Sequence, residues 1–146
     1  MNLNLNSRLE EARSELLMWS TQLDDKWQCL EEMAQSLNVG RDVLIPIRYE
    51  AVRQADDVVI GFATFLGMKK IGLNWCLCMG IGPQNVAYWE EPWEWIPLAR
   101  WNRDMSVEAA EHVDELVEML TEAAEVKTAE VEEAAAMVSQ AIARLV

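Results

Sequence analysis

The sole histidine of this 146-residue chain lies among acidic residues that could, in principle, assist acid–base chemistry. His112 has Glu108, Glu111 and Glu115 at helical spacing around it. A histidine that acts as a general base needs a positioned partner and a pocket for the substrate. The exposed face of a helix provides neither, so we interpret His112 as a surface residue.

The three cysteines are candidate metal ligands, because thiolates bind zinc. Cys76 and Cys78 are two residues apart in a segment that alternates like a strand, so both thiols lie on one strand face. Zinc sites usually pair cysteines across a tight turn, and a disulfide between neighbours on one strand face has poor geometry. We therefore predict that these two cysteines and Cys29 are reduced and structural, with no bound metal.

Motifs that mark common enzyme classes are absent from the sequence. It contains no G-x-G-x-x-G, no phosphate-binding loop, no G-x-S-x-G and no H-E-x-x-H. The six serines fall within or at the ends of expected helices, with no histidine near them in sequence. We predict no catalytic residue and no cofactor.

Five of the seven tryptophans fall within 27 residues: Trp75, Trp89, Trp93, Trp95 and Trp101. An indole ring offers a large apolar area and one hydrogen-bond donor, which suits both a core and a binding hot spot. Alternation places Trp93 and Trp95 on one strand face, where we expect them to pack under the helices. Trp89 and Trp101 lie near strand ends, and we expect them to be exposed and to contact a partner.

Glutamates recur every three or four residues in the C-terminal third of the chain, and we call them the predicted acidic row: Glu108, Glu111, Glu115, Glu118, Glu122 and Glu125. No Lys or Arg lies between Ser106 and Val126 to offset them. Like charges at this spacing destabilise a helix by a few tenths of a kcal/mol per pair. The row is therefore either a solvated helix face or a surface that binds a basic patch, including one that normally holds nucleic acid.

The overall charge favours a basic partner. Twenty-five Asp and Glu residues against twelve Lys and Arg give a formal net charge of −13. Such a field repels nucleic acid and anionic membranes, so we expect neither to bind directly. The N-terminus lacks the pattern of a secretory signal, and the longest apolar stretch, 58–68, is too short for a membrane helix. We expect a cytoplasmic protein.

The periodicity predicts one domain over residues 1–146, with a helix over 7–38, a sheet region over 43–98 and a helix over 106–146. Ser7 is the expected N-cap of the first helix, and Asn38 and Gly40 are expected to end it. The middle region is expected to form an antiparallel meander of three or four strands, with Pro46 confining its strand to an edge. Turns are expected around 67–70 and 82–85.

The C-terminal region keeps its apolar residues on one face from Val113 to Leu145. This phase predicts a single helix of about 40 residues, about 60 Å long, with a bend near Thr128 as the alternative. The first helix is expected to cover only part of it. The remaining overhang favours a homodimer, with Ala134, Ala135 and Ala136 permitting close helix approach.

These features predict an α+β fold in which a long N-terminal helix and a very long C-terminal helix pack together over the sheet. We expect a non-enzymatic, acidic interaction module. An inhibitor or decoy of the phage anti-defence or immunity-protein kind, which occludes a basic partner surface, fits this description. The alternative is a small ligand-binding protein or enzyme that uses an aromatic-lined pocket on the sheet near Trp75 and Trp93.

Overall fold

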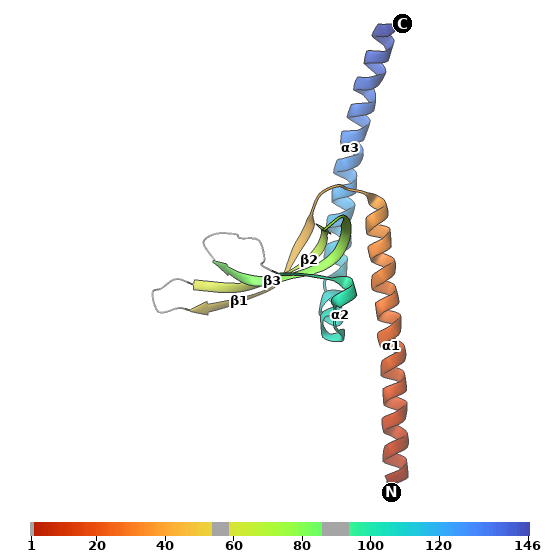
Figure 1. The fold of residues 1–146 in the computed structure, drawn as a ribbon, viewed down its shortest axis with the longest axis vertical. Helices are drawn as coiled ribbons and strands as arrows, with labels where there is room; N and C mark the ends of the chain where they lie inside the picture. The colour runs from red at the N-terminus through yellow and green to blue at the C-terminus, as the bar shows by residue number, and fades with distance from the viewer. Residues whose placement is uncertain (1, 54–58, 86–93) are drawn as a thin grey trace.

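The α+β class predicted from the sequence is confirmed by the computed structural model, which describes residues 2–53, 59–85 and 94–146 (Figure 1). The elements follow in the order α1 (Asn2–Leu37), β1 (Val43–Arg53), β2 (Val59–Ile71), β3 (Asn74–Asn85), β4 (Glu94–Pro97), the 3-10 helix η1 (Leu98–Arg100), α2 (Arg103–Ala110) and α3 (Val113–Leu145).

The four strands form an antiparallel meander in the order β1-β2-β3-β4, as expected. Pro46 lies in β1, which is an edge strand as expected, and the pairing with β2 shifts register between Pro46 and Arg48. The hairpin between β2 and β3 turns at Gly72, whose φ of 65° is the left-handed conformation that glycine tolerates.

The expected turns around 67–70 and 82–85 are wrong, because both segments lie inside strands. Gly67 is required for a different reason. A Cβ at this position would collide with the carbonyl oxygen of Val43 on the neighbouring strand. The glycine therefore permits a close approach of two backbones rather than a reversal of the chain.

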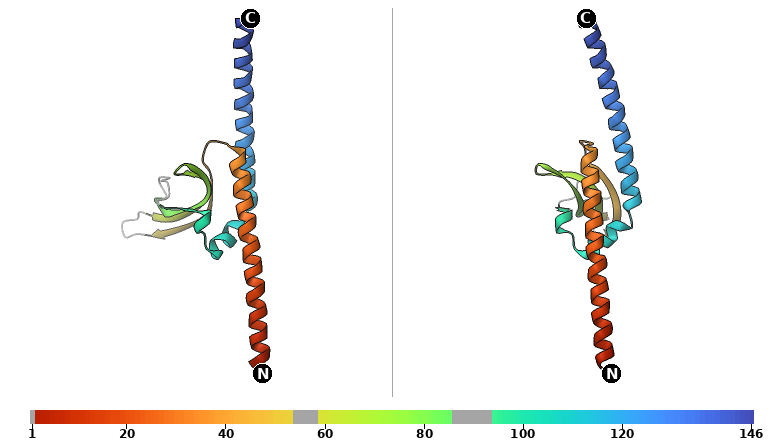
Figure 2. Two further views of the ribbon diagram at one scale, coloured as in Figure 1. Left: turned by 45° about the vertical axis from the view of Figure 1, so that its right-hand side comes forward. Right: turned by 90° about the vertical axis from the view of Figure 1, so that its right-hand side faces the viewer.

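The two long helices run in the same direction and are staggered along it (Figures 1 and 2). The C-terminal half of α1 lies beside the N-terminal half of α3, and the outer halves extend to opposite ends of the molecule. At 1.5 Å per residue, 36 and 33 residues give helices of about 54 and 50 Å. Because of the stagger, α1 leaves the distal half of α3 uncovered although the two helices are of similar length.

The core lies between the helices and one face of the sheet. Its fully buried side chains include Leu66, Leu77 and Met79 from the strands and Leu116 from α3. Trp27 of α1 joins the same cluster, and its indole Nε1 donates a 3.1 Å hydrogen bond to the carbonyl oxygen of Ser106. The core thus binds α1, α2, α3 and the sheet into one body.

The ends of α1 differ partly from the expectation. The helix begins at Asn2, so Ser7 lies inside it and does not cap it. Its end matches the expected signals: Asn38 has a left-handed φ of 47°, and its N–H donates to the carbonyl oxygen of Gln35. Gly40 also has a positive φ.

The C-terminal region is not one continuous helix over 106–146. It breaks at Glu111 and His112, between α2 and α3, and not near Thr128. On one side of the break α2 buries Ser106 and Ala109, and on the other α3 packs along β1. Thr128 remains helical.

Candidate interaction surface

An exposed row of carboxylates follows the first half of α3, and we call it the α3 acidic row: Glu115, Glu118, Glu122 and Glu125. At 100° per residue, these side chains lie on the side of the helix opposite the buried Leu116 and Leu120. The sequence from Asp104 to Val126 contains no Lys or Arg. In the part of the chain that the structure describes, no Lys or Arg forms an ion pair with a member of the row.

Two members of the predicted acidic row are placed elsewhere. Glu108 belongs to α2, is partly buried, and its Oε1 lies 3.4 Å from Nε of Arg48 on β1. Glu111 is exposed in the break between the helices. The break therefore divides the six glutamates, and four of them share one helix face.

His112 and Asp114 lie beside the N-terminal end of the α3 acidic row. His112 has its Nδ1 3.8 Å from Oε2 of Glu115. Asp114 is exposed, stands four residues before Glu118, and adds a carboxylate that our sequence reasoning missed. The sequence did contain the signal for Asp114, because an aspartate four residues from a glutamate shares its helix face and carries the same charge.

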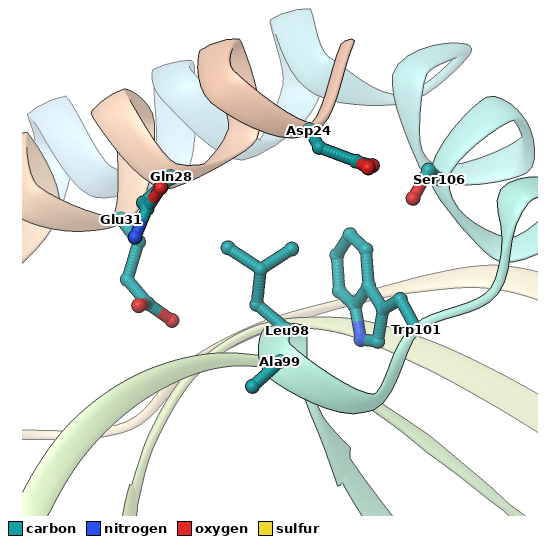
Figure 3. A pocket seen from close by; sticks show the side chains of 7 residues that line it. All are labelled: Asp24, Gln28, Glu31, Leu98, Ala99, Trp101 and Ser106. Carbon is teal, nitrogen blue, oxygen red and sulfur yellow. The ribbon is translucent and has the colours of Figure 1, made fainter. Parts of the chain in front are cut away.

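An open hollow of about 270 Å³ lies between α1 and the η1–α2 segment (Figure 3). Its lining residues are Asp24, Gln28, Glu31, Leu98, Ala99, Trp101 and Ser106. Trp101 is half-buried here, not exposed as expected: its ring meets Trp27 edge to face, and its Nε1 donates a 2.9 Å bond to the carbonyl oxygen of Ile96.

The hollow combines negative charge with an aromatic wall. Asp24 and Glu31 carry its two carboxylates, and Glu31 also accepts a 2.9 Å hydrogen bond from the backbone N–H of Leu77. Carboxylates beside an indole ring suit an ammonium or guanidinium group. Residues 24, 28 and 31 are far from Trp101 in sequence, so only the folded chain brings them together.

Of the other tryptophans for which the sequence predicted a position, the structure describes Trp95. Trp89 and Trp93 lie outside the described residues. Trp95 does not pack under the helices as expected. From β4 its ring lies directly over Gly80, in the space that a side chain at position 80 would need. Nζ of Lys69 is 5.0 Å from the centroid of this ring. Gly80 follows the core residue Met79, so this ring covers the face of the sheet away from the helices.

The cysteines are free, and they differ in exposure: Cys29 is exposed and Cys78 is buried. Burial, with a smaller contribution from Cys76, raises the pKa of the Cys78 thiol to about 12. Burial also raises the pKa of Cys76. Both thiols therefore resist forming the thiolate that acts as a nucleophile or metal ligand. Within residues 2–53, 59–85 and 94–146, no group of three His, Cys, Asp or Glu residues could hold a metal ion.

Beside Trp75 the packing leaves a space of only about 20 Å³, between α1, β1, β2 and α3. This volume is near the minimum for one water molecule, so a ligand has no room there. Among the described helices, none is long and apolar enough to cross a membrane. The chain matches no protein-family model, no curated protein and no solved structure.

Proposed function

We propose that this protein is a non-enzymatic interaction module that covers a basic surface of another protein through the α3 acidic row, as an inhibitor or decoy. The observation that carries the proposal is the row itself: Glu115, Glu118, Glu122 and Glu125 are exposed on the outer face of α3.

The energetics support a binding role over simple solvation. Adjacent glutamates in the row stand three or four residues apart, so each pair destabilises α3 by a few tenths of a kcal/mol. Solvation alone is achieved equally well by alternating charges, which add stability instead. A basic partner would relieve the repulsion, and the net charge of −13 would speed its approach.

The test compares three baits in affinity capture from host cells, read by quantitative mass spectrometry. The first is the natural chain, and the second carries Glu115→Lys, Glu118→Lys, Glu122→Lys and Glu125→Lys. The matched control carries the same change of charge at four exposed positions on α1: Glu10→Lys, Glu11→Lys, Asp25→Lys and Glu32→Lys.

We expect one basic protein to be enriched by the natural chain and by the control, and to be lost from the row variant. Its capture should weaken as salt rises through the range in which charges are screened. Circular dichroism establishes that each bait is folded. Equal capture by the row variant and the natural chain would refute the proposal.

The hollow lined by Trp101 favours a second candidate, the binding of a small cationic molecule. Asp24 and Glu31 would hold the positive charge against the indole ring. Calorimetric titration with arginine and with spermidine tests this candidate, and Asp24→Asn should weaken any binding at least several-fold. A titration without heat for either amine removes the candidate.

A further inference from the structure

The outer halves of the two long helices are exposed on every side. We call residues 4–22 of α1 the α1 overhang and residues 125–145 of α3 the α3 overhang. Every side chain from 4 to 19 and from 125 to 146 is exposed. This includes large apolar side chains, with Leu9 at 66%, Trp19 at 61% and Val138 at 58% exposure. Helices of this length have little stability in water without a packed face.

Each overhang carries one apolar stripe, and each stripe continues a face that is already in the core. On α1, Leu5, Leu9, Ala12, Leu16 and Trp19 extend the line of Leu23, Trp27, Leu30 and Ala34. On α3, Val131, Ala134, Val138, Ala141 and Leu145 extend the line of Leu116, Leu120 and Ala123. Both stripes follow heptad spacing, which is typical of helices that pack along each other.

We propose that the α1 overhang of one copy packs on the α3 overhang of a second copy of this chain. The apolar stripes of the two overhangs would then pack against each other between copies, as the inner parts of the same helix faces pack together in the core of one copy. The lengths agree: 19 and 21 residues give about 29 and 32 Å. The overhangs point to opposite ends of the molecule, so one such contact leaves each copy with a free overhang for the next (Figure 1).

Side-chain size supports this pairing over the pairing of two identical overhangs. The α1 stripe is rich in large residues, with Leu9, Leu16 and Trp19. The α3 stripe alternates its larger residues with Ala134 and Ala141. Large side chains that face small ones fill the space between two helices without voids.

Charge supports the same choice. Arg8 and Arg13 border the α1 stripe on its two sides, whereas Glu130 borders the α3 stripe. Pairing two α1 overhangs in parallel register would set Arg8 of one copy against Arg13 of the other. Pairing α1 with α3 instead brings Arg13 toward the carboxylate of Glu130, which it would share with Lys127, whose Nζ lies 3.6 Å from Oε2 of Glu130. Glu125, the last member of the α3 acidic row, begins the α3 overhang but lies on the face opposite the stripe, so the contact stands or falls independently of the proposed function.

The experiment uses two full-length variants, Leu16→Glu on the α1 stripe and Val138→Glu on the α3 stripe. Controls on the opposite faces are Ser14→Glu and Gln140→Glu, both at exposed positions. Light scattering coupled to size exclusion gives the mass of each sample, and circular dichroism verifies folding. Each stripe variant damages one overhang and leaves the other overhang sound.

The natural chain and both controls should exceed 16.7 kDa, with a mass that rises with concentration. Leu16→Glu alone and Val138→Glu alone should each have the mass of one chain. An equimolar mixture of the two should reach twice that mass, because one sound α1 overhang then meets one sound α3 overhang. A natural chain of 16.7 kDa at all concentrations, a stripe variant that still associates, or a mixture that stays at one chain overturns the proposal.

Discussion

The rings of Trp27 and Trp101 meet edge to face, with centroids 5.4 Å apart and planes inclined by 75°. Trp27 belongs to α1, and Trp101 lies between η1 and α2. Each indole N–H is satisfied by a backbone carbonyl, that of Ser106 for Trp27 and that of Ile96 for Trp101. This pair therefore joins the first helix to the segment that leads into the C-terminal helices.

Replacement of Trp27 should destabilise the protein strongly. Trp27→Ala removes a buried indole and should lower the free energy of unfolding by about 3–5 kcal/mol. Trp27→Phe keeps most of the apolar area but leaves the Ser106 carbonyl oxygen without its donor, and should cost about 1–3 kcal/mol. Denaturant unfolding followed by circular dichroism measures both. A Trp27→Phe variant as stable as the natural chain would show that the hydrogen bond contributes nothing.

Gly67→Ala should be far more damaging than Gly40→Ala. A Cβ at position 67 meets the Val43 backbone, which cannot move without disrupting the strand pairing, so we expect a loss of about 3 kcal/mol. A Cβ at position 40 meets nothing, and only the positive φ of 75° is strained, at about 1 kcal/mol. The same unfolding measurement ranks the two, and a reversed order would contradict the backbone approach described for β1 and β2.

Stability should fall at alkaline pH because of Cys78. Its thiol has a pKa of about 12 in the folded chain, raised by burial from an ordinary value of 9.0. Below pH 9 the thiol is protonated in both states. Between about pH 9 and 12 the unfolded chain loses this proton and the folded chain keeps it, so unfolding becomes more favourable as pH rises. The slope of unfolding free energy against pH over this range should be shallower in Cys78→Ala.

Neutralising part of the α3 acidic row should stabilise the fold. Glu118 and Glu122 are four residues apart and both exposed, and Glu118→Gln with Glu122→Gln removes like-charge repulsion along the row. The expected gain is a few tenths of a kcal/mol per relieved pair, seen as a melting temperature higher by about 1–3 °C. An unchanged or lower melting temperature at low salt would mean that the row is not under electrostatic strain.

Sequence patterns were sufficient for the features that depend on local chemistry. The apolar period located both long helices, alternation located the meander, and Pro46 correctly marked an edge strand. The turns were misplaced because glycine has two uses: Gly72 reverses the chain, whereas Gly67 admits a neighbouring strand. Composition alone does not separate these uses.

The break at Glu111 and His112 was invisible because the apolar phase continues through it. Ala109 of α2 and Leu116 of α3 are both fully buried in one core, and this tertiary packing leaves no mark on the apolar period. The hollow beside Trp101 was missed for the same reason, since Asp24 and Glu31 reach it only through the fold. The α3 acidic row was found from sequence because its members are neighbours on one helix.

The parallel stagger of α1 and α3 places the two chain termini at opposite tips of a rod (Figures 1 and 2). A rod has a larger frictional coefficient than a sphere of equal mass, so even a single chain will sediment slowly and elute early from a gel-filtration column. Elution volume compared with globular standards would therefore report an assembly where none exists. For the same reason, labels attached at the two ends of one chain will be too far apart for efficient energy transfer, and a strong transfer signal will arise only between neighbouring molecules.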